Sequence, residues 1–139
     1  MLGIILTGHG KFATGLQSSV ELIAGKQEKF AAVDFEKGES SNLLTNKLKT
    51  TISNMIDDEG IIIFTDIPGG TPFTQSVLLS QEDQRIKVIT GVNLPAIMDG
   101  IFNRTLDTDA FIEKVLQSGK NNLMLYLEKE KESSNEDGI

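Results

Sequence analysis

The sequence predicts an α/β protein built on an open, doubly wound and mainly parallel sheet with helices on both faces. Two observations support this fold class. Short apolar runs alternate along the chain with segments whose apolar residues recur at helical spacing, and polar or glycine-containing loops separate the two kinds of segment. Strands joined through helices take right-handed crossovers, so the strands should be parallel, and the expected strand order is 2-1-3-4.

The first half of the chain supplies two strands and two helices. Residues 2–9 form a buried apolar strand, and helical spacing then predicts a helix over residues 11–24 that Gly25 ends. A second strand is expected over residues 29–35. The next helix presents its apolar residues on one face and is ended by Gly60; these residues are Leu44, Leu48, Ile52, Met55 and Ile56.

The second half continues the alternation. Residues 61–65 are β-branched and aromatic, which is typical of a strand buried on both faces. After a loop, Thr71 is expected as the N-cap and Pro72 as the first residue of the third helix. Residues 85–90 are the fourth strand. The loop at residues 91–95 follows it.

The chain then turns mainly helical before its end. Two further helices are expected around the apolar sets Ile97, Met98, Ile101 and Phe102, and Phe111, Ile112, Val115 and Leu116, with Gly119 after the second. Residues 122–127 predict a fifth strand. One domain should therefore occupy residues 1–127, and residues 128–139, which are charged and almost without apolar anchors, should form a frayed tail.

Composition excludes several functional classes. Thirteen Lys and Arg against twenty Asp and Glu give a net charge of −7, which repels nucleic acid. The chain has no cysteine and a single histidine, so we expect no metal site of the thiolate or histidine-cluster kind, and no cofactor is required. The first apolar run is too short for a signal peptide and no stretch reaches about 20 apolar residues, so the cytoplasm is the expected compartment.

The strongest candidate site joins His9 to Asp66. Ligands of open parallel sheets bind beyond the carboxyl ends of the strands, where the predicted order brings the loops after the first and third strands together. A neutral imidazole is a nucleophile, and a carboxylate that accepts a hydrogen bond from one ring nitrogen leaves the other free to attack. The alternative is a histidine that only satisfies a turn, with Asp66 capping a loop.

A second candidate is the loop Gly69, Gly70 and Thr71. Backbone N–H groups that lead into a helix N-terminus bind anions such as a phosphoryl group, although a flexible loop before an ordinary helix has the same sequence signature. The rim of the site is expected to include Thr7, Gly8, Gly10 and Asn93. Asn93 has an equally simple alternative role, in a turn that starts a helix.

The residues leave two other classes open. Residues 8–13 fit the G-x-G-x-x-A pattern of dinucleotide-binding proteins, and Asp34 lies about 20 residues on, where such proteins place a ribose-binding acid. The match is weak, because a histidine between the glycines has no role in dinucleotide binding. A receiver-like domain that is phosphorylated on Asp66 and depends on a divalent metal is the other possibility.

Three separated stretches together resemble the IIA component of the mannose-family sugar phosphotransferase system. They are GIILTGHGKFATGL at residues 3–16, FTDIPGGTPF at residues 64–73 and VITGVNLP at residues 88–95. The similarity runs in order over roughly residues 1–127. Agreement of three separated motifs is far more specific than any one of them.

This resemblance implies a function. His9 would accept a phosphoryl group from the phosphocarrier HPr and pass it to a histidine of the IIB component, which phosphorylates the sugar entering through the IIC and IID membrane subunits. Asp66 would orient the imidazole, and Gly69, Gly70 and Thr71 would bind the phosphoryl oxygens. The resemblance also points to a homodimer in which residues 123–127 are exchanged as an edge strand.

One departure bears on the sugar. The mannose transporter's own component has Trp-Gly-Gly-Ser where this chain has Pro-Gly-Gly-Thr at residues 68–71. Together with residues 22–25 and 33–35, this difference looks closer to the amino-sugar branch of the family, such as components for N-acetylgalactosamine or galactosamine. Mannose is therefore not the expected sugar.

Overall fold

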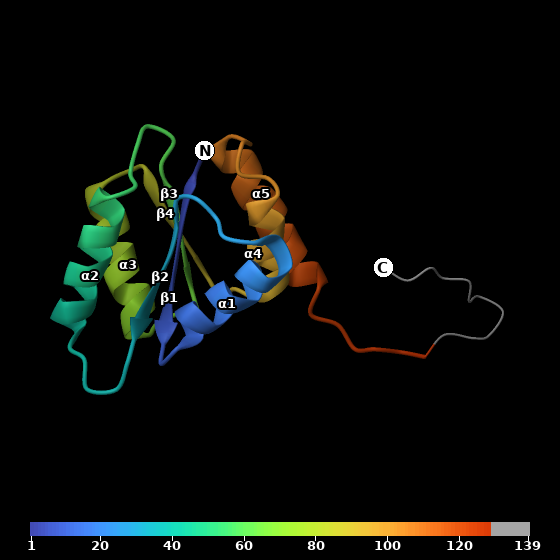
Figure 1. Ribbon diagram of the computed structural model, residues 1–139, viewed down its shortest axis with the longest axis horizontal. Coiled ribbons are helices and arrows are strands. Elements are labelled where there is room, and N and C mark those ends of the chain that lie inside the picture. The colour runs from blue at the N-terminus through green and yellow to red at the C-terminus, as the bar shows by residue number, and fades with distance from the viewer. Residues whose placement is uncertain (129–139) are drawn as a thin grey trace.

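A computed structural model of the chain describes residues 1–128, and in Figure 1 a sheet stands between two layers of helices. The elements follow one another in the order β1 (Gly3–His9), α1 (Phe12–Ala24), β2 (Phe30–Phe35), α2 (Ser41–Ser53), β3 (Ile61–Thr65), α3 (Thr71–Glu82), β4 (Ile86–Thr90), α4 (Leu94–Ile101) and α5 (Thr108–Asn121).

The four strands of the described chain are all parallel and lie in the order β2-β1-β3-β4. This confirms the predicted fold class and strand order. The register aligns Thr7 of β1 with Thr65 of β3, and Thr65 with Thr90 of β4. On the other side of β1, His9 is level with Phe35 of β2. The order places β1 in the middle of the sheet, so its carboxyl end is flanked by both neighbours.

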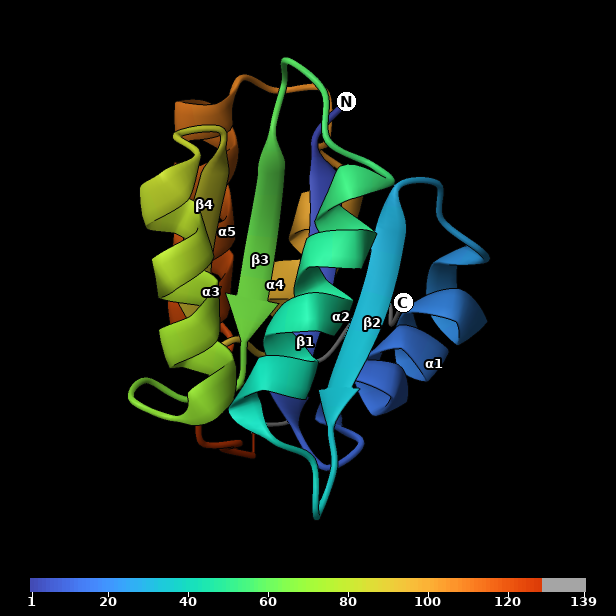
Figure 2. The same cartoon turned by 90° about the vertical axis from the view of Figure 1, so that its left-hand side faces the viewer.

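Alternate residues of each strand face two separate apolar cores. Ile4 and Leu6 face α1, α4 and α5, whereas Ile5 faces α2 and α3. Figure 2 shows α2 and α3 in front of the sheet, with the other helices behind it. β3 is buried on both faces, as its unbroken apolar sequence predicts.

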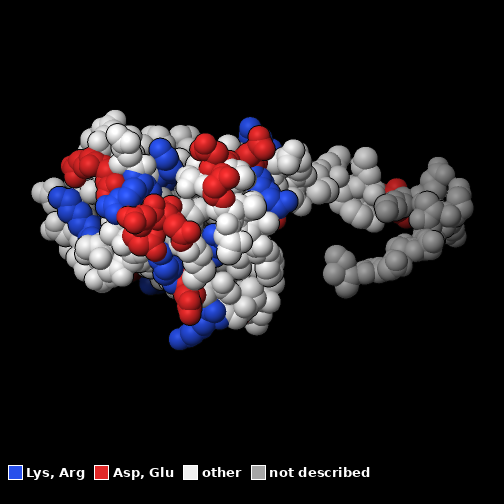
Figure 3. Space-filling view, turned by 90° about the horizontal axis from the view of Figure 1, so that it is seen from above, with Lys and Arg blue, Asp and Glu red and all other residues white. Residues whose placement is uncertain are grey.

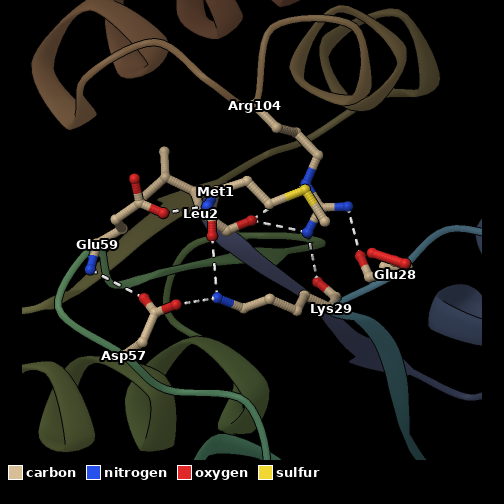
Figure 4. Close-up of polar contacts among 7 residues, drawn as sticks. All are labelled: Met1, Leu2, Glu28, Lys29, Asp57, Glu59 and Arg104. Carbon is tan, nitrogen blue, oxygen red and sulfur yellow. Dashed lines mark hydrogen bonds and ion pairs between the residues drawn. The ribbon is translucent and has the colours of Figure 1, made fainter.

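A polar network closes the amino end of the sheet (Figure 4). Arg104 lies after α4, and only 6% of its surface is exposed. Its guanidinium donates to three main-chain carbonyls. Nε and Nη2 donate to Leu2 O at 3.1 and 2.7 Å, Nη2 donates to Lys29 O at 2.6 Å, and Nη1 donates to Glu28 O. Burial lowers the pKa of Arg104 below its ordinary range.

Charged pairs surround this network. Lys29 Nζ donates to Met1 O and to Asp57, and Arg85 forms a two-pronged pair with Asp83. The same end of the molecule carries interspersed acidic and basic side chains (Figure 3). The amino end is thus held together by contacts between segments that are far apart in sequence.

Several predicted boundaries are wrong. The second helix ends at Ser53, well before Gly60, and Met55 and Ile56 cover the core from the turn that follows. Gly119 lies inside α5 rather than after it, because its bare backbone lets α5 approach α4: a Cβ there would stand 3.3 Å from Ala96 Cβ. α3 begins as predicted, but Gly70 is its N-cap and Thr71 its first residue.

The predicted fifth strand is not a strand of this chain. Residues 123–128 have no regular structure, and five consecutive apolar side chains there are 69–85% exposed: Leu123, Met124, Leu125, Tyr126 and Leu127. The outer edge of β4 has no strand partner within residues 1–128. Apart from Glu128, the predicted tail lies outside the described residues.

Candidate functional site

His9 is the last residue of β1 and leaves the sheet at its carboxyl end, which lies at the bottom of Figure 1. It follows Ile5 and Thr7 at every second position, so its side chain is on the face covered by α2 and α3. The His9 side chain is 46% exposed, whereas the residues before it in β1 are buried. A rigid central strand therefore presents a single reactive ring to solvent.

Asp66 directly follows β3 and lies beside His9. Its Oδ2 accepts hydrogen bonds from the main-chain N–H of His9 at 2.9 Å and from His9 Nδ1 at 2.7 Å, and its Oδ1 accepts from Ile67 N–H at 2.9 Å. An ionised carboxylate can only accept, so Nδ1 must carry the proton and Nε2 must hold the free lone pair in the neutral ring.

The same contacts keep Asp66 ionised. Burial of the side chain, which is 11% exposed, would by itself raise the pKa of Asp66. The hydrogen bonds that His9 and Ile67 donate outweigh it and lower the pKa of Asp66 below its ordinary value of 3.8. Asp66 is therefore a fixed negative charge next to the ring.

The start of α3 borders the other side of the ring. A Cβ built on Gly70 would lie 2.6 Å from His9 Cε1 and 3.2 Å from His9 Nε2, so only glycine leaves room for the imidazole. Gly69 has φ +87, a conformation that glycine adopts without strain. The predicted loop of Gly69, Gly70 and Thr71 is thus brought next to the free nitrogen of His9.

The N-terminus of α3 differs from those of the other helices. Ser40, Asn93 and Asp107 cap α2, α4 and α5 with their own side chains, and Asp34 accepts the Thr14 N–H in the first turn of α1. Within residues 1–128 no side chain accepts a hydrogen bond from the first turn of α3. Its free N–H groups and positive dipole end therefore remain available beside His9.

The residues expected on the rim of the site have different structural roles. Thr7 is fully buried beneath the site, and its hydroxyl has no hydrogen-bond partner within the described chain. Gly8 gives room to Phe12, because a Cβ there would lie 2.6 Å from that ring. Gly10 has φ +60 and turns the chain out of the strand while its N–H donates to Phe35 O at 2.7 Å.

Asn93 is occupied in a structural contact. Its Oδ1 accepts from Ala96 N–H, and its Nδ2 donates to Gly119 O at 3.0 Å. It therefore caps α4 and ties the start of that helix to the end of α5, which is the simpler of its two sequence interpretations. A role for Asn93 on the rim of the site stays a prediction.

The structure gives Asp34 and Phe35, which lie near the site, roles that the sequence did not predict. Asp34 accepts the N–H and the hydroxyl of Thr14 at 3.0 and 2.7 Å, so its two oxygens hold the start of α1 rather than facing a ribose. Phe35 stands against His9, with ring centroids 5.9 Å apart and planes at 72°. Only the alignment of the β1 and β2 ends reveals this neighbour.

Two further features of the described chain concern ligands and membranes. Residues 1–128 bring no three His, Cys, Asp or Glu side chains together in an arrangement that would hold a metal ion. No helix in this part of the chain has the length and apolar character needed to cross a bilayer.

Comparison with known proteins identifies the family. Residues 3–116 match the family described as "PTS system fructose IIA component". The chain is 33% identical to the fructose-specific EIIA component of Bacillus subtilis over 71% of this chain and 68% of that protein. It is 26% identical to the mannose-specific EIIAB component of Escherichia coli K12, over 86% of this chain and 38% of the longer protein.

A solved structure agrees with this match. The phosphotransferase system component EIIA from Streptococcus agalactiae superposes with a TM-score of 0.82 at 38% identity, covering 89% of this chain and 96% of that one. The family match spans His9, Asp66 and the start of α3, so it includes every part of the site described above. The chain belongs to the mannose-family IIA components of the sugar phosphotransferase system.

Proposed function

We propose that the chain is a phosphocarrier that accepts a phosphoryl group from phospho-HPr on Nε2 of His9 and passes it to a histidine of a IIB component. The observation that carries this proposal is the 2.7 Å contact between His9 Nδ1 and Asp66 Oδ2, which leaves Nε2 as the nucleophile. The carrier would act in the cytoplasm, where HPr operates, and would serve the IIC and IID membrane subunits only through IIB.

The transfer needs no external base. The lone pair of Nε2 attacks phosphorus while the phosphorus–nitrogen bond to the donor histidine breaks. The donor ring carries a proton on its other nitrogen, so it leaves as a neutral imidazole. The His9 ring keeps its proton on Nδ1 and becomes a phosphoimidazolium. Asp66 accepts that proton in a hydrogen bond and offsets the positive charge of the ring. Transfer to IIB is the same step in reverse order.

The start of α3 supports the same step. Free N–H groups next to Nε2 would donate to the phosphoryl oxygens, with Gly69, Gly70 and Thr71 supplying main-chain N–H groups and Thr71 also a hydroxyl. A charge at a helix N-terminus gains about 0.3–1 kcal/mol when exposed and up to about 2 kcal/mol when partly buried. In a chain of net charge −7, such local donors matter for holding an anion.

The test is labelling with phosphoenolpyruvate, enzyme I and HPr. The expected result is one phosphoryl group on the protein, labile to acid and stable to base, and none on His9→Ala. His9 is the sole histidine, and its half-exposed side chain lies at the end of β1 outside the core, so this variant should fold. Acid-labile label on His9→Ala contradicts the assignment.

Two other outcomes would favour the alternative functions. A base-labile label that needs a divalent metal would favour phosphorylation of Asp66, and nucleotide binding without label would favour a dinucleotide-binding module.

We also propose a homodimer in which residues 123–127 of each chain pair with the β4 edge of the other. Two features of the described chain support it: the apolar side chains of this segment are exposed, and β4 has a free edge. A hollow of about 400 Å³ lies along that edge, between β4 and α5, with Ile89, Val115 and Leu123 among its lining residues. An edge strand that covers it would also remove an aggregation hazard.

Truncation after Asn122 tests the exchange. The full chain should sediment as a dimer and the truncated chain as a monomer or an aggregating species. Lys114→Ala, a change on an exposed part of α5 away from the hollow, should leave the dimer intact. A truncated chain that remains a stable dimer rules the exchange out. The sugar remains a separate proposal: we favour an amino sugar, to be tested by uptake through the cognate membrane subunits.

A further inference from the structure

We propose that Phe35 is a positioning residue for His9: its ring fixes the plane of the imidazole so that Nε2 faces the start of α3. This inference rests on the phosphoryl-transfer function proposed above. It concerns a side chain that makes no hydrogen bond to the reacting group and that acts through its contact with the imidazole alone.

The contact is built into the register of the sheet. Phe35 ends β2 and His9 ends β1, and the two residues are directly paired in the parallel ladder, so their side chains leave the same face. Their rings meet edge-to-face at 5.9 Å between centroids and 72° between planes, a geometry that aromatic pairs favour. Phe35 is half-buried and also packs on the core beneath α2 and α3, which holds its own ring in place.

Two further contacts keep the chain ends in this alignment. Gly10 N–H donates to Phe35 O at 2.7 Å, immediately after His9. One residue further on, Lys11 Nζ donates to Glu36 at 3.0 Å. The segment that carries His9 is therefore joined to the segment that carries Phe35 by a main-chain hydrogen bond and by an ion pair, which keeps the ends of β1 and β2 aligned.

The imidazole needs this contact because its other restraints are incomplete. The hydrogen bond to Asp66 fixes one atom of the ring, Nδ1, and still permits the ring to tilt about that atom. Gly70 stands close to Cε1 and Nε2 but only limits movement toward α3. Phe35 contacts the ring from β2, on the side of β1 opposite to β3. β2 and β3 thus hold the ring of β1 between them, one by an aromatic contact and the other by a carboxylate.

The expected consequence is kinetic. Phosphoryl transfer depends on the alignment of the attacking nitrogen, and a misplacement of about 1 Å can slow such a step by roughly 10²-fold. Phe35→Leu keeps an apolar side chain but loses the flat ring. It should slow phosphoryl transfer by about 10- to 100-fold at saturating phospho-HPr, without changing the phospho-HPr concentration that gives half the maximal rate. Phe35→Tyr keeps the ring and should restore the wild-type rate.

Histidine dynamics supply the decisive readout. Because His9 is the only histidine, ¹³C-labelled histidine gives Cδ2 and Cε1 signals from this ring alone. Their order parameters in the unphosphorylated protein should fall in Phe35→Leu and stay at the wild-type level in Phe35→Tyr. Phe30→Leu is the matched control, since it makes the same change at the other end of β2 and should leave both ring motion and labelling rate unchanged.

The outcomes separate this proposal from the one on which it rests. Wild-type order parameters in Phe35→Leu overturn the positioning role, whether or not the protein accepts phosphoryl groups. Weaker HPr binding with an unchanged maximal rate also overturns it, since Phe35 would then be a docking residue. If wild-type protein takes no label at all, the proposed function fails, and the ring dynamics still decide whether Phe35 restrains His9.

Discussion

The two ends of the sheet use polar groups in opposite ways. At the amino end, the guanidinium of Arg104 is buried. Its N–H groups donate to the carbonyls of Leu2, Glu28 and Lys29. At the carboxyl end, His9 is half exposed and the first turn of α3 has no side-chain acceptor in the described chain. The first arrangement stabilises the fold, whereas the second leaves donors free for a ligand.

The difference extends to single hydroxyl groups. Thr65 donates to Thr90 at 2.7 Å, but Thr7, in the same row across the sheet, is fully buried and has no hydrogen-bond partner within residues 1–128. An unsatisfied group of this kind lowers stability, and it occurs two residues before His9, on the same face of β1. The proposed function and the stability of the fold therefore depend on different ends of one sheet, and variants at each end should separate them.

The largest effect is expected at the carboxyl end, for Asp66→Asn. Asparagine is nearly the same size but also donates hydrogen bonds, which permits the wrong imidazole tautomer, and it has no charge to offset a phosphoimidazolium. Phosphoryl transfer should slow by about 10²–10⁴-fold in both directions, while the fold remains. Rapid-quench labelling of a variant with a native circular dichroism spectrum measures this. A wild-type rate would reduce Asp66 to a loop cap, and no label even at long times would suggest that Asp66 itself is phosphorylated.

The amino end should respond in the reverse manner. Arg104→Met fills most of the same volume but removes the guanidinium from three carbonyls, of which Lys29 O still accepts from Ile4 N–H. The free energy of unfolding should therefore fall by about 2–4 kcal/mol. The labelling rate per folded molecule should not change. Urea unfolding supplies the first quantity, with Arg85→Met as the control, because its exposed pair with Asp83 contributes little. Equal losses in both variants would show that the buried network is not special.

Thr7→Val tests the unpartnered hydroxyl near the carboxyl end of the sheet. Valine has the same shape without the unpartnered hydroxyl, and removal of that buried polar group should raise the free energy of unfolding by about 1 kcal/mol. Thr65→Val is the matched control, since it removes a hydroxyl that is paired with Thr90 and should lower stability. Thermal unfolding of the two variants is sufficient. A loss of stability in Thr7→Val would mean that its hydroxyl is satisfied in solution.

The smallest effect concerns acid. The pair with Arg85 lowers the pKa of Asp83 to about 2, below the ordinary 3.8, so the unfolded chain takes up this proton first as the pH falls. The stability due to the pair is then present above about pH 4 and disappears toward pH 2. Asp83→Asn should be slightly less stable than wild type at pH 7 and equal to it near pH 2. A gap in melting temperature that does not close at low pH would contradict this.

Pattern and spacing predict most of the fold but only part of the site. The alternation of apolar runs and helical faces predicts the parallel sheet, and the order 2-1-3-4, which is common in such folds, brings His9 and Asp66 together as expected. Local signals fail where a tertiary contact decides. Gly119 stays helical because α4 packs against it, and residues 123–127, although apolar, pair with no strand within residues 1–128.

The site residues that escaped prediction were those defined by register. The sequence indicates only that Phe35 is a strand residue. Its contact with His9 becomes evident when the ends of β1 and β2 are aligned in the sheet. Asp34 fits a dinucleotide motif by spacing, but its carboxylate is used by Thr14 across the strand–helix junction. A spacing rule counts residues along one chain, whereas these roles depend on neighbours from another element.

Two glycines without room for a side chain illustrate what a mutational scan of this protein would record. A Cβ on Gly60, which has φ +92, would stand 2.4 Å from Arg85 O, so substitutions there should reduce cellular abundance. A Cβ on Gly70 would instead meet the imidazole of His9, a side chain that can swing out toward solvent. Variants at position 70 should therefore accumulate normally and yet fail a selection for growth on the transported sugar. Comparing abundance with growth at these two positions distinguishes selection for folding from selection for phosphoryl transfer.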